Sequence, residues 1–261
     1  MSLAFRLVLA AMLFSTLLAC AGPSPEAPPP AGPAVRWEGR SAAAVLAELL
    51  REQDRIRDLS AAFSLSVDPP PEGRPSATNG VILFSRGDGR TRLRITALGP
   101  FGRTFFDMVR ENGRLTVYVP SRDTAYRGTP EGAVPAGGGP EPVFADLFAD
   151  LSEVRAAADG VVVRENGNLL LPLKDGNLVL DPAGGLLRAW RRDEAVIEYG
   201  GYVQPSGGPS VPTRVRVRKR DGSLRVDCRL REVSLEPSPA GAFELPIKDS
   251  TTVRPLEALE R

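Results

Sequence analysis

Short apolar–polar alternating segments, joined by two-residue turns, fill the second half of the chain. Asn166-Gly167, Asp175-Gly176 and Asp221-Gly222 each stand between two such segments. Asn-Gly and Asp-Gly supply the positive φ angles of tight hairpins, so each pair predicts two antiparallel neighbours. Asn112-Gly113 gives the same signal in the first half. This series predicts an antiparallel meander, and no strand–helix–strand alternation accompanies it.

The predicted strands share the period-two alternation and are bounded by turn residues. They are Phe63–Val67, Val81–Arg86, Arg90–Ala97, Thr104–Arg110, Arg114–Val119, Val161–Glu165, Leu169–Lys174, Asn177–Asp181, Gly185–Arg191, Ala195–Tyr202, Thr213–Arg220, Leu224–Arg231 and Val233–Glu236. Ser121–Gly139 is predicted to be a loop.

Two segments show helical spacing of apolar residues. Ser41 can cap a helix that runs to about Phe63 and presents one apolar stripe. Glu141–Ala158 carries a second apolar stripe, with Pro142 in its first turn. We therefore expect a mainly β, α+β fold: one large curved antiparallel sheet, an open half-barrel, with two main helices as a lid over its apolar concave face.

The N-terminal segment has the layout of a secretory signal. Met1–Ala19 holds an early arginine and an apolar run too short for a comfortable membrane span. It ends in Leu17-Leu18-Ala19-Cys20, which resembles the lipobox of bacterial lipoproteins. That resemblance implies acylation of Cys20, which would prevent a disulfide with Cys228. An ordinary cleaved signal that happens to contain a cysteine is the alternative.

The predicted domain organisation follows from composition. Residues 1–19 are the signal peptide, and 20–40 are the acylated cysteine with a Pro/Ala/Gly-rich tether. Residues 41–250 form the half-barrel domain and 251–261 a C-terminal tail. By analogy with lipoprotein sorting in enteric bacteria, Ala21 after the cysteine favours the outer membrane as the location.

A large aromatic residue stands at a predicted loop tip. The loop is Gly99-Pro100-Phe101-Gly102, between the strands Arg90–Ala97 and Thr104–Arg110. The hairpin itself offers Phe101 no neighbours. Either another element covers the ring, or the ring enters an apolar phase such as a membrane.

Basic residues dominate the segment from Thr213 to Arg231. Eight are basic and two are acidic, an excess of six. The basic residues are Arg214, Arg216, Arg218, Lys219, Arg220, Arg225, Arg229 and Arg231. Cys228 falls on the apolar side of this alternation and reads as a small core residue. The basic side is either a solvated face that resists edge pairing or a surface that attracts anionic head groups.

Composition gives no reason to expect an enzyme. The chain of 261 residues has a net charge of +1 and contains no histidine, which removes the commonest general base and metal ligand. No phosphate-binding loop and no metal-binding carboxylate pattern occurs in the sequence. We expect no catalytic residue, no metal, no cofactor and no nucleic-acid partner.

The order of several short motifs resembles the LolA/LolB family of bacterial lipoprotein carriers, most closely its lipid-anchored LolB branch. The motifs are Leu17–Cys20, Ala61-Ala62-Phe63, Gly80-Val81-Ile82-Leu83-Phe84, Arg92-Leu93-Arg94-Ile95, Gly99-Pro100-Phe101-Gly102, Tyr199-Gly200-Gly201-Tyr202, Val211-Pro212, Arg214–Arg220 and Leu224–Arg231. The resemblance covers about Ser41 to Pro246. It implies an open half-barrel whose cavity accepts the acyl chains of lipoproteins, and a protruding apolar loop residue, here Phe101, that assists membrane insertion.

The expected function is therefore delivery of acylated lipoproteins to the outer membrane, without nucleotide or covalent catalysis. The resemblance implies a monomer anchored in the outer membrane, facing the periplasm, that receives cargo from a periplasmic LolA-like carrier. The expected cavity residues point inward from the sheet and the two helices. They are Leu49, Leu83, Leu93, Ile95, Phe106, Met108, Val117, Leu147, Phe148, Leu171, Val215 and Val217. A protein that binds another amphiphile, senses the envelope state or is structural remains the alternative.

Overall fold

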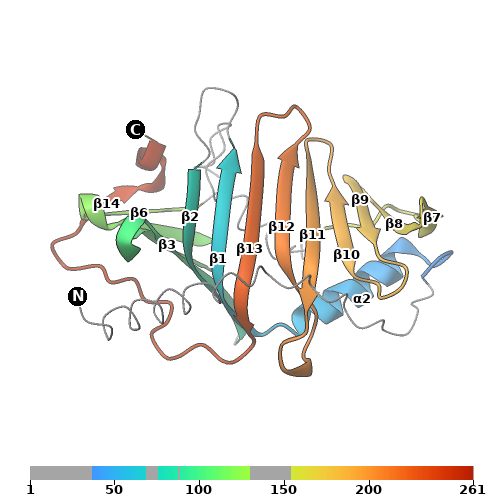
Figure 1. Ribbon diagram of the computed structural model, residues 1–261, viewed down its shortest axis with the longest axis horizontal. Helices are drawn as coiled ribbons and strands as arrows, with labels where there is room; N and C mark the ends of the chain where they lie inside the picture. The colour runs from blue at the N-terminus through green and yellow to red at the C-terminus, as the bar shows by residue number, and fades with distance from the viewer. Residues whose placement is uncertain (1–36, 69–75, 88, 130–153, 261) are drawn as a thin grey trace, which may run out of the picture. The chain divides into compact units, whose positions relative to one another are not determined.

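One open sheet organises the protein. The computed structural model describes residues 37–68, 76–87, 89–129 and 154–260, all within the unit Ala31–Arg261. Fourteen strands follow the order β14-β6-β5-β4-β3-β2-β1-β13-β12-β11-β10-β9-β8-β7 (Figure 1). The neighbours in this order are antiparallel except for the parallel pair of β14 and β6. The two ends of the order do not pair, so the sheet is unclosed and antiparallel-rich.

Most strands agree with the predicted hairpins, but the separate strand predicted at Val233–Glu236 is wrong, because β13 continues through Val233 to Ser234. Their bounds are β1 Asp58–Asp68, β2 Ser76–Gly87, β3 Arg90–Leu98, β4 Thr104–Glu111, β5 Arg114–Val119, β6 Thr124–Gly128, β7 Val163–Glu165, β8 Asn168–Leu173, β9 Gly176–Leu180, β10 Leu187–Arg191, β11 Ala195–Val203, β12 Val211–Lys219, β13 Arg225–Ser234 and β14 Thr252–Pro255. Short 3-10 turns lie at Pro100–Gly102, Pro120–Arg122, Pro205–Gly207 and Leu256–Glu260.

The first helix is shorter than its apolar spacing predicts. Helix α2 spans Ala42–Asp54, a run of alanine, leucine and glutamate that favours helix. The prediction that it continues to Phe63 is wrong, because residues from Asp58 onward belong to β1. In β1 every second residue from Leu59 to Leu65 is buried, which is the period of a strand. Among the described residues, no helix has both the length and the apolar character needed to cross a bilayer.

The second predicted helix is not supported. Residues 141–153 of the predicted Glu141–Ala158 lie outside the described residues. Val154–Ala158 are described and are not helical, since Ala156 forms an isolated bridge with Leu173. The backbone N–H of Ala157 also donates to the carbonyl of Pro172 at 3.1 Å. The described part of the chain therefore contains one α-helix.

The sequence analysis did not predict two of the strands, β6 and β14. β6 lies within the segment Ser121–Gly139 that was predicted to be a loop, and it pairs with β5. β14 lies within the predicted C-terminal tail and pairs with β6. Residues 252–255 are therefore part of the sheet rather than an appendage.

The predicted signal peptide, Cys20 and most of the tether lie outside the described residues. The end of the predicted tether is described, and it packs on the fold. Trp37 is buried and donates from Nε1 to Glu48 Oε2 on α2 at 2.8 Å. Arg40 binds the same carboxylate at 2.7 Å. The folded part thus begins before Ser41.

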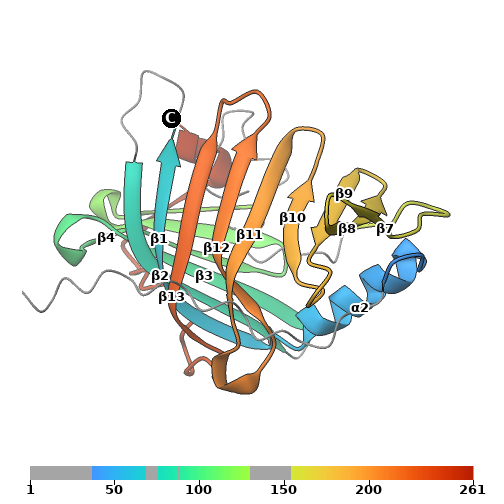
Figure 2. The same ribbon diagram turned by 45° about the vertical axis from the view of Figure 1, so that its right-hand side comes forward.

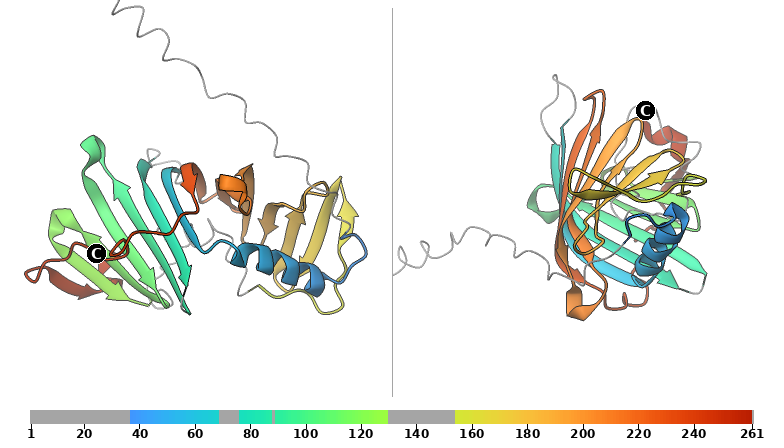
Figure 3. Two further views of the ribbon diagram at one scale, coloured as in Figure 1. Left: turned by 90° about the horizontal axis from the view of Figure 1, so that it is seen from below. Right: turned by 90° about the vertical axis from the view of Figure 1, so that its right-hand side faces the viewer.

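The strand register divides the sheet into two faces. On the inner face, a row across β2 to β6 consists of apolar residues that are all buried: Ile82, Ile95, Met108, Val117 and Tyr126. Helix α2 lies on this inner side, against the β8 end of the sheet (Figures 2 and 3).

The predicted inward position of Leu83 is wrong. Leu83 pairs with Arg94, in the row next to the one that joins Ile82 and Ile95. Because successive residues of a strand point to opposite faces, Leu83 lies on the outer face and Ile82 takes the inner position.

A C-terminal segment crosses the outer face of β3 and β4. Arg94 donates from Nη1 to the carbonyl of Ala242 at 2.7 Å and forms an ion pair with buried Asp107 at 2.5 Å. The guanidinium of Arg92 stacks over the ring of Phe243 at 4.5 Å. These contacts hold the segment that leads from β13 to β14 against the sheet.

The close approach of strands at Gly80 predicts that alanine destabilises the protein at Gly80 but not at Gly200. A Cβ at Gly80 would lie 2.1 Å from the carbonyl oxygen of Thr96 and 2.6 Å from the ring of Phe63. At Gly200 it would meet no heavy atom within 4 Å. We expect Gly80→Ala to lower the free energy of unfolding by about 1–3 kcal/mol, as overpacking does. Gly200→Ala should leave it unchanged or raise it by less than about 1 kcal/mol. Urea denaturation of both variants tests the register, and equal effects would contradict it.

Candidate functional site

A groove lies between α2 and one end of the sheet. Its volume is about 850 Å³. The residues that line it come from α2 and its flanks, from the β9–β10 turn, and from β11, β12 and the loop between them. They are Trp37, Glu48, Leu49, Arg51, Glu52, Gln53, Arg55, Ile56, Gly184, Gly185, Leu186, Leu187, Tyr199, Tyr202, Gln204, Gly208, Pro209, Ser210 and Pro212.

The floor of the groove is apolar and aromatic. Leu49 of α2 and Ile56, which follows the helix, face Leu187 and Tyr199 of the sheet, and all four pack against the core. The Tyr202 hydroxyl donates to the carbonyl of Leu187, and burial raises the pKa of that hydroxyl above its ordinary value. The Tyr202 phenol therefore stays neutral and contributes an apolar ring to the lining.

Contacts at both ends of α2 hold it beside the sheet as one wall of the groove. At the N-terminal end, the backbone N–H of Gly39 donates to Val162 and that of Ala42 to Gly160, each at 2.8 Å. At the C-terminal end, Asp54 binds Arg86 of β2 at 2.5 Å. These contacts attach the helix to β2 and to the segment before β7.

Charged side chains of α2 form the rim of the groove. Glu48 accepts hydrogen bonds from Arg40 and Trp37, and the Arg40 bond is the main reason that the pKa of Glu48 lies below its ordinary value. Glu52 pairs with Arg55 at 2.7 Å, and both are exposed. A polar rim around an apolar floor suits an amphiphile, whose tail is buried while its head stays in water.

The structure distributes the predicted cavity residues differently from the prediction. Leu49 lines the groove. Seven others are buried in the core, and Phe106 is half-buried against it. The seven are Leu93, Ile95, Met108, Val117, Leu171, Val215 and Val217. Leu83 lies on the outer face, and Leu147 and Phe148 lie outside the described residues.

Sequence reasoning missed most of the groove lining. Leu187, Tyr199, Tyr202 and Pro212 were assigned to strands or to the family motifs, but not to a cavity. Tyr199 and Tyr202 belong to a motif that the resemblance had singled out, Tyr199-Gly200-Gly201-Tyr202. That motif was the available signal, since tyrosine rings bury large apolar areas while their hydroxyls find a hydrogen-bond partner.

The loop Gly99–Gly102 places Phe101 entirely in solvent. The Phe101 side chain is fully exposed, at 101% of its reference area. Its backbone is in the left-handed region, with φ 63° and ψ 22°, which is costly for a residue with a Cβ. Neither burial nor backbone preference explains a phenylalanine here.

A second exposed aromatic residue lies beside the loop. Phe105 of β4 is 64% exposed, and its ring meets that of Phe106 edge-on at 6.0 Å. A Cβ at Gly99 would lie 3.9 Å from the Cβ of Phe105, so the loop folds next to this ring. Phe101 and Phe105 together make one end of the β3–β4 hairpin apolar. The sequence analysis had singled out Phe101 alone.

The described residues offer no metal site. No group of three or more histidine, cysteine, aspartate or glutamate side chains lies close enough among them to hold an ion. Burial raises the pKa of the Cys228 thiol to about 12, which keeps it protonated at neutral pH.

The comparisons with known proteins identify the fold. No protein-family model matches the chain, and no curated protein matches it. Several solved structures do match the chain. A DUF1329 family protein from Desulfovibrio piger aligns with a TM-score of 0.59 at 10% identity, covering 79% of this chain and 98% of the other. A domain from Vibrio parahaemolyticus, named as a candidate for outer-membrane lipoprotein sorting, aligns with a TM-score of 0.58 at 12% identity, covering 78% and 97%.

A LolA superfamily protein from Nitrosomonas europaea aligns with a TM-score of 0.50 at 14% identity, covering 78% of this chain and 98% of the other. The chain therefore has a LolA/LolB-like fold, as the sequence motifs predicted.

Exposure of Phe101 predicts that its ring contributes nothing to stability. We expect Phe101→Ala to change the free energy of unfolding by less than about 1 kcal/mol, because the ring has no packing to lose. The same substitution at buried Phe63 should cost about 3–5 kcal/mol. Urea denaturation measures both. A loss at Phe101 close to that at Phe63 would show that the ring is covered.

Proposed function

We propose that the protein is a lipid carrier of the bacterial envelope that holds the acyl chains of lipoproteins in the groove beside α2. The observation that carries this proposal is the groove itself, an apolar floor under a charged rim with a volume of about 850 Å³. That volume lies within the range of roughly 300–1,000 Å³ that small-molecule sites occupy. The LolA/LolB-like fold supports the same reading.

Transfer of the acyl chains needs no chemical step. Burial of each methylene contributes about 0.8 kcal/mol, whether it enters an apolar groove or a bilayer. The two free energies nearly cancel, so a chain can leave the groove for a membrane without nucleotide hydrolysis. In this proposal the protein is a carrier rather than an enzyme, and it works as a monomer.

The tip of the β3–β4 hairpin contacts the receiving membrane in this proposal. Phe101 is fully exposed and Phe105 largely so, and both would gain free energy by leaving water. Their insertion would hold the protein at the bilayer and disturb the lipid packing there. This gives Phe101 the role that the LolB branch assigns to its protruding apolar residue.

Location and partners complete the proposal. Acylation of Cys20 would anchor the protein in the outer membrane, with residues 20–40 as a tether and the folded domain in the periplasm. A periplasmic LolA-like carrier would supply the cargo. These are the properties of the LolB branch. Depletion of the protein, followed by membrane fractionation, tests this assignment, and normal lipoprotein delivery to the outer membrane would contradict it.

A charge in the groove should abolish acyl-chain binding. We expect Leu49→Glu to weaken binding of a fluorescent fatty acid by about tenfold or more, because burying an unpaired carboxylate costs more than 1.4 kcal/mol. Leu83→Glu is the matched control: Leu83 is also half-buried but lies on the outer face opposite Arg94. The Leu83→Glu variant should bind the fluorescent fatty acid as well as the unmodified protein does.

Thermal denaturation of both variants shows whether they remain folded. Equal binding by the two glutamate variants would contradict the groove as the binding site. Lipid extraction from the purified protein, followed by mass spectrometry, identifies the cargo. Recovery of an amphiphile other than an acylated protein would favour a LolB-like protein with a different ligand.

A further inference from the structure

The outer face of the sheet from β10 to β1 is rich in arginine. We call this surface the arginine face. The register places three rows on this face, and they carry six arginines and three acidic residues, an excess of three positive charges. The arginines are Arg191, Arg214, Arg216, Arg218, Arg225 and Arg229, and the acidic residues are Asp68, Glu198 and Asp227.

Direct cross-strand pairing does not favour this arrangement. Arg214 pairs directly with Arg229, and Arg218 directly with Arg225. Like charges at directly opposed positions of an antiparallel pair destabilise it. The neighbouring acidic residues Asp68, Glu198 and Asp227 offset part of this repulsion, but the three rows keep an excess of three positive charges. An anion that binds across the strands would offset the positive charge that remains.

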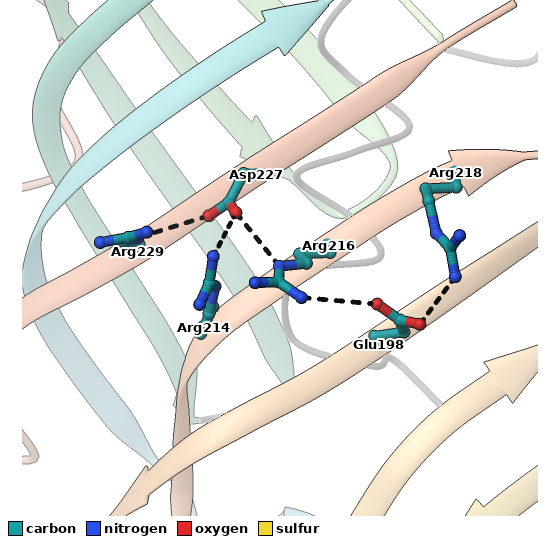
Figure 4. Close-up of polar contacts among 6 residues, drawn as sticks. All are labelled: Glu198, Arg214, Arg216, Arg218, Asp227 and Arg229. Carbon is teal, nitrogen blue, oxygen red and sulfur yellow. Dashed lines mark hydrogen bonds and ion pairs between the residues drawn. The ribbon is translucent and has the colours of Figure 1, made fainter. Parts of the chain in front are cut away.

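Two of these carboxylates, Asp227 and Glu198, hold four guanidinium groups in place (Figure 4). The four belong to Arg214, Arg216, Arg218 and Arg229. Asp227 binds Arg214 at 2.7 Å, Arg216 at 3.2 Å and Arg229 at 3.5 Å. Burial acts to raise the pKa of Asp227, but the bonds from Arg214 and Arg216 outweigh it and keep the pKa below its ordinary value. Asp227 therefore remains ionised at neutral pH.

Glu198 completes the network, with Arg218 at 2.8 Å and Arg216 at 3.9 Å. Each guanidinium has five N–H donors, and these contacts use one or two of them. The side chains of Arg218 and Arg229 are exposed. The network is thus pre-organised, and these exposed guanidinium groups still have donors to offer.

The outer face continues from the arginines toward the tip of the β3–β4 hairpin. The row that contains Arg214 and Arg229 passes through Ser64 of β1 and Asn79 of β2 to Leu98 of β3, the residue before the loop Gly99–Gly102. The side chains of Ser64 and Asn79 are small and uncharged, so no acidic residue of this row separates the basic surface from the exposed aromatic residues.

We propose that the arginine face binds the anionic head groups of a phospholipid membrane. Arginine matches phosphate oxygens with paired N–H donors, and these donors are spread over strands β10 to β13, about 14 Å at a spacing of about 4.8 Å per strand. A surface of this breadth fits an array of head groups better than it fits one acidic peptide. The proposal goes beyond the carrier function, because it requires no cargo in the groove beside α2.

The test compares two triple variants of the full chain in a vesicle-sedimentation assay. The first is Arg218→Gln, Arg225→Gln and Arg229→Gln, three exposed residues of the arginine face. The control is Arg57→Gln, Arg122→Gln and Arg254→Gln, three exposed residues outside it. Both lose three charges and share one N-terminus, so any contribution of residues 1–36 cancels.

On phosphatidylcholine vesicles that contain phosphatidylglycerol, we expect the first variant to bind about a hundredfold more weakly at low salt, at about 1 kcal/mol per basic side chain. The control should bind almost as well as the unmodified protein. Added salt should narrow the difference, and pure phosphatidylcholine vesicles should show none.

An equal loss in both triple variants would overturn the proposal, and so would the absence of any loss. Loss of binding to a polyglutamate peptide, with vesicle binding intact, would assign the face to an acidic protein instead. Arg225→Glu alone leaves the network of Figure 4 intact and gives the same test if the triple variant fails to fold. Fatty-acid binding by folded variants should be unchanged, which separates this proposal from the carrier function.

Discussion

Alternation of side chains along the strands of one open sheet is the constraint on which the rest of the structure depends. In each strand, one set of residues must enter the core while the other set faces away from it, and a slip of one residue would exchange the two sets. Ile82 and Leu83 show the consequence. They are neighbours of nearly equal hydrophobicity, yet the first is buried on the inner face and the second pairs with Arg94 on the outer face.

This separation allows one sheet to present two different surfaces. The inner face carries the core and the helix α2, and the groove forms where α2 passes the ends of β10, β11 and β12. The outer face carries the arginines of β12 and β13, and a C-terminal segment covers part of β3 and β4. The proposed sites for cargo binding and for membrane docking therefore lie on opposite faces of the sheet, so one can be changed without the other.

Much of the sheet was predictable because its signals are local. The turn Asn112-Gly113 and the alternation after it gave β5 with its observed bounds, Arg114–Val119. The end of α2 was not predictable from spacing alone, because Leu59 and Phe63 continue the helical stripe of Val45 and also fit a strand. β14 carries no local signal: it is four residues long, and its parallel partner β6 lies more than a hundred positions earlier in the chain.

The candidate site was harder to predict than the fold. Inward-facing residues such as Ile95 and Val215 look alike whether a core is filled or hollow, and in the structure they are filled core. The groove instead depends on where α2 ends and on two turns, around Gly184 and Gly208, that approach it only in the folded chain. By contrast, Phe101 was predictable, because a glycine on each side of Pro100-Phe101 left the ring without a local partner.

A photoactivatable fatty acid, cross-linked to the protein and mapped by mass spectrometry, tests most directly whether the groove beside α2 receives an acyl chain. The account predicts cross-links in the Glu48–Ile56 segment and in the opposing residues Leu186–Leu187 and Tyr199–Pro212. Cross-links confined to the inner residues of β2 to β5, or none to the folded protein, would contradict it.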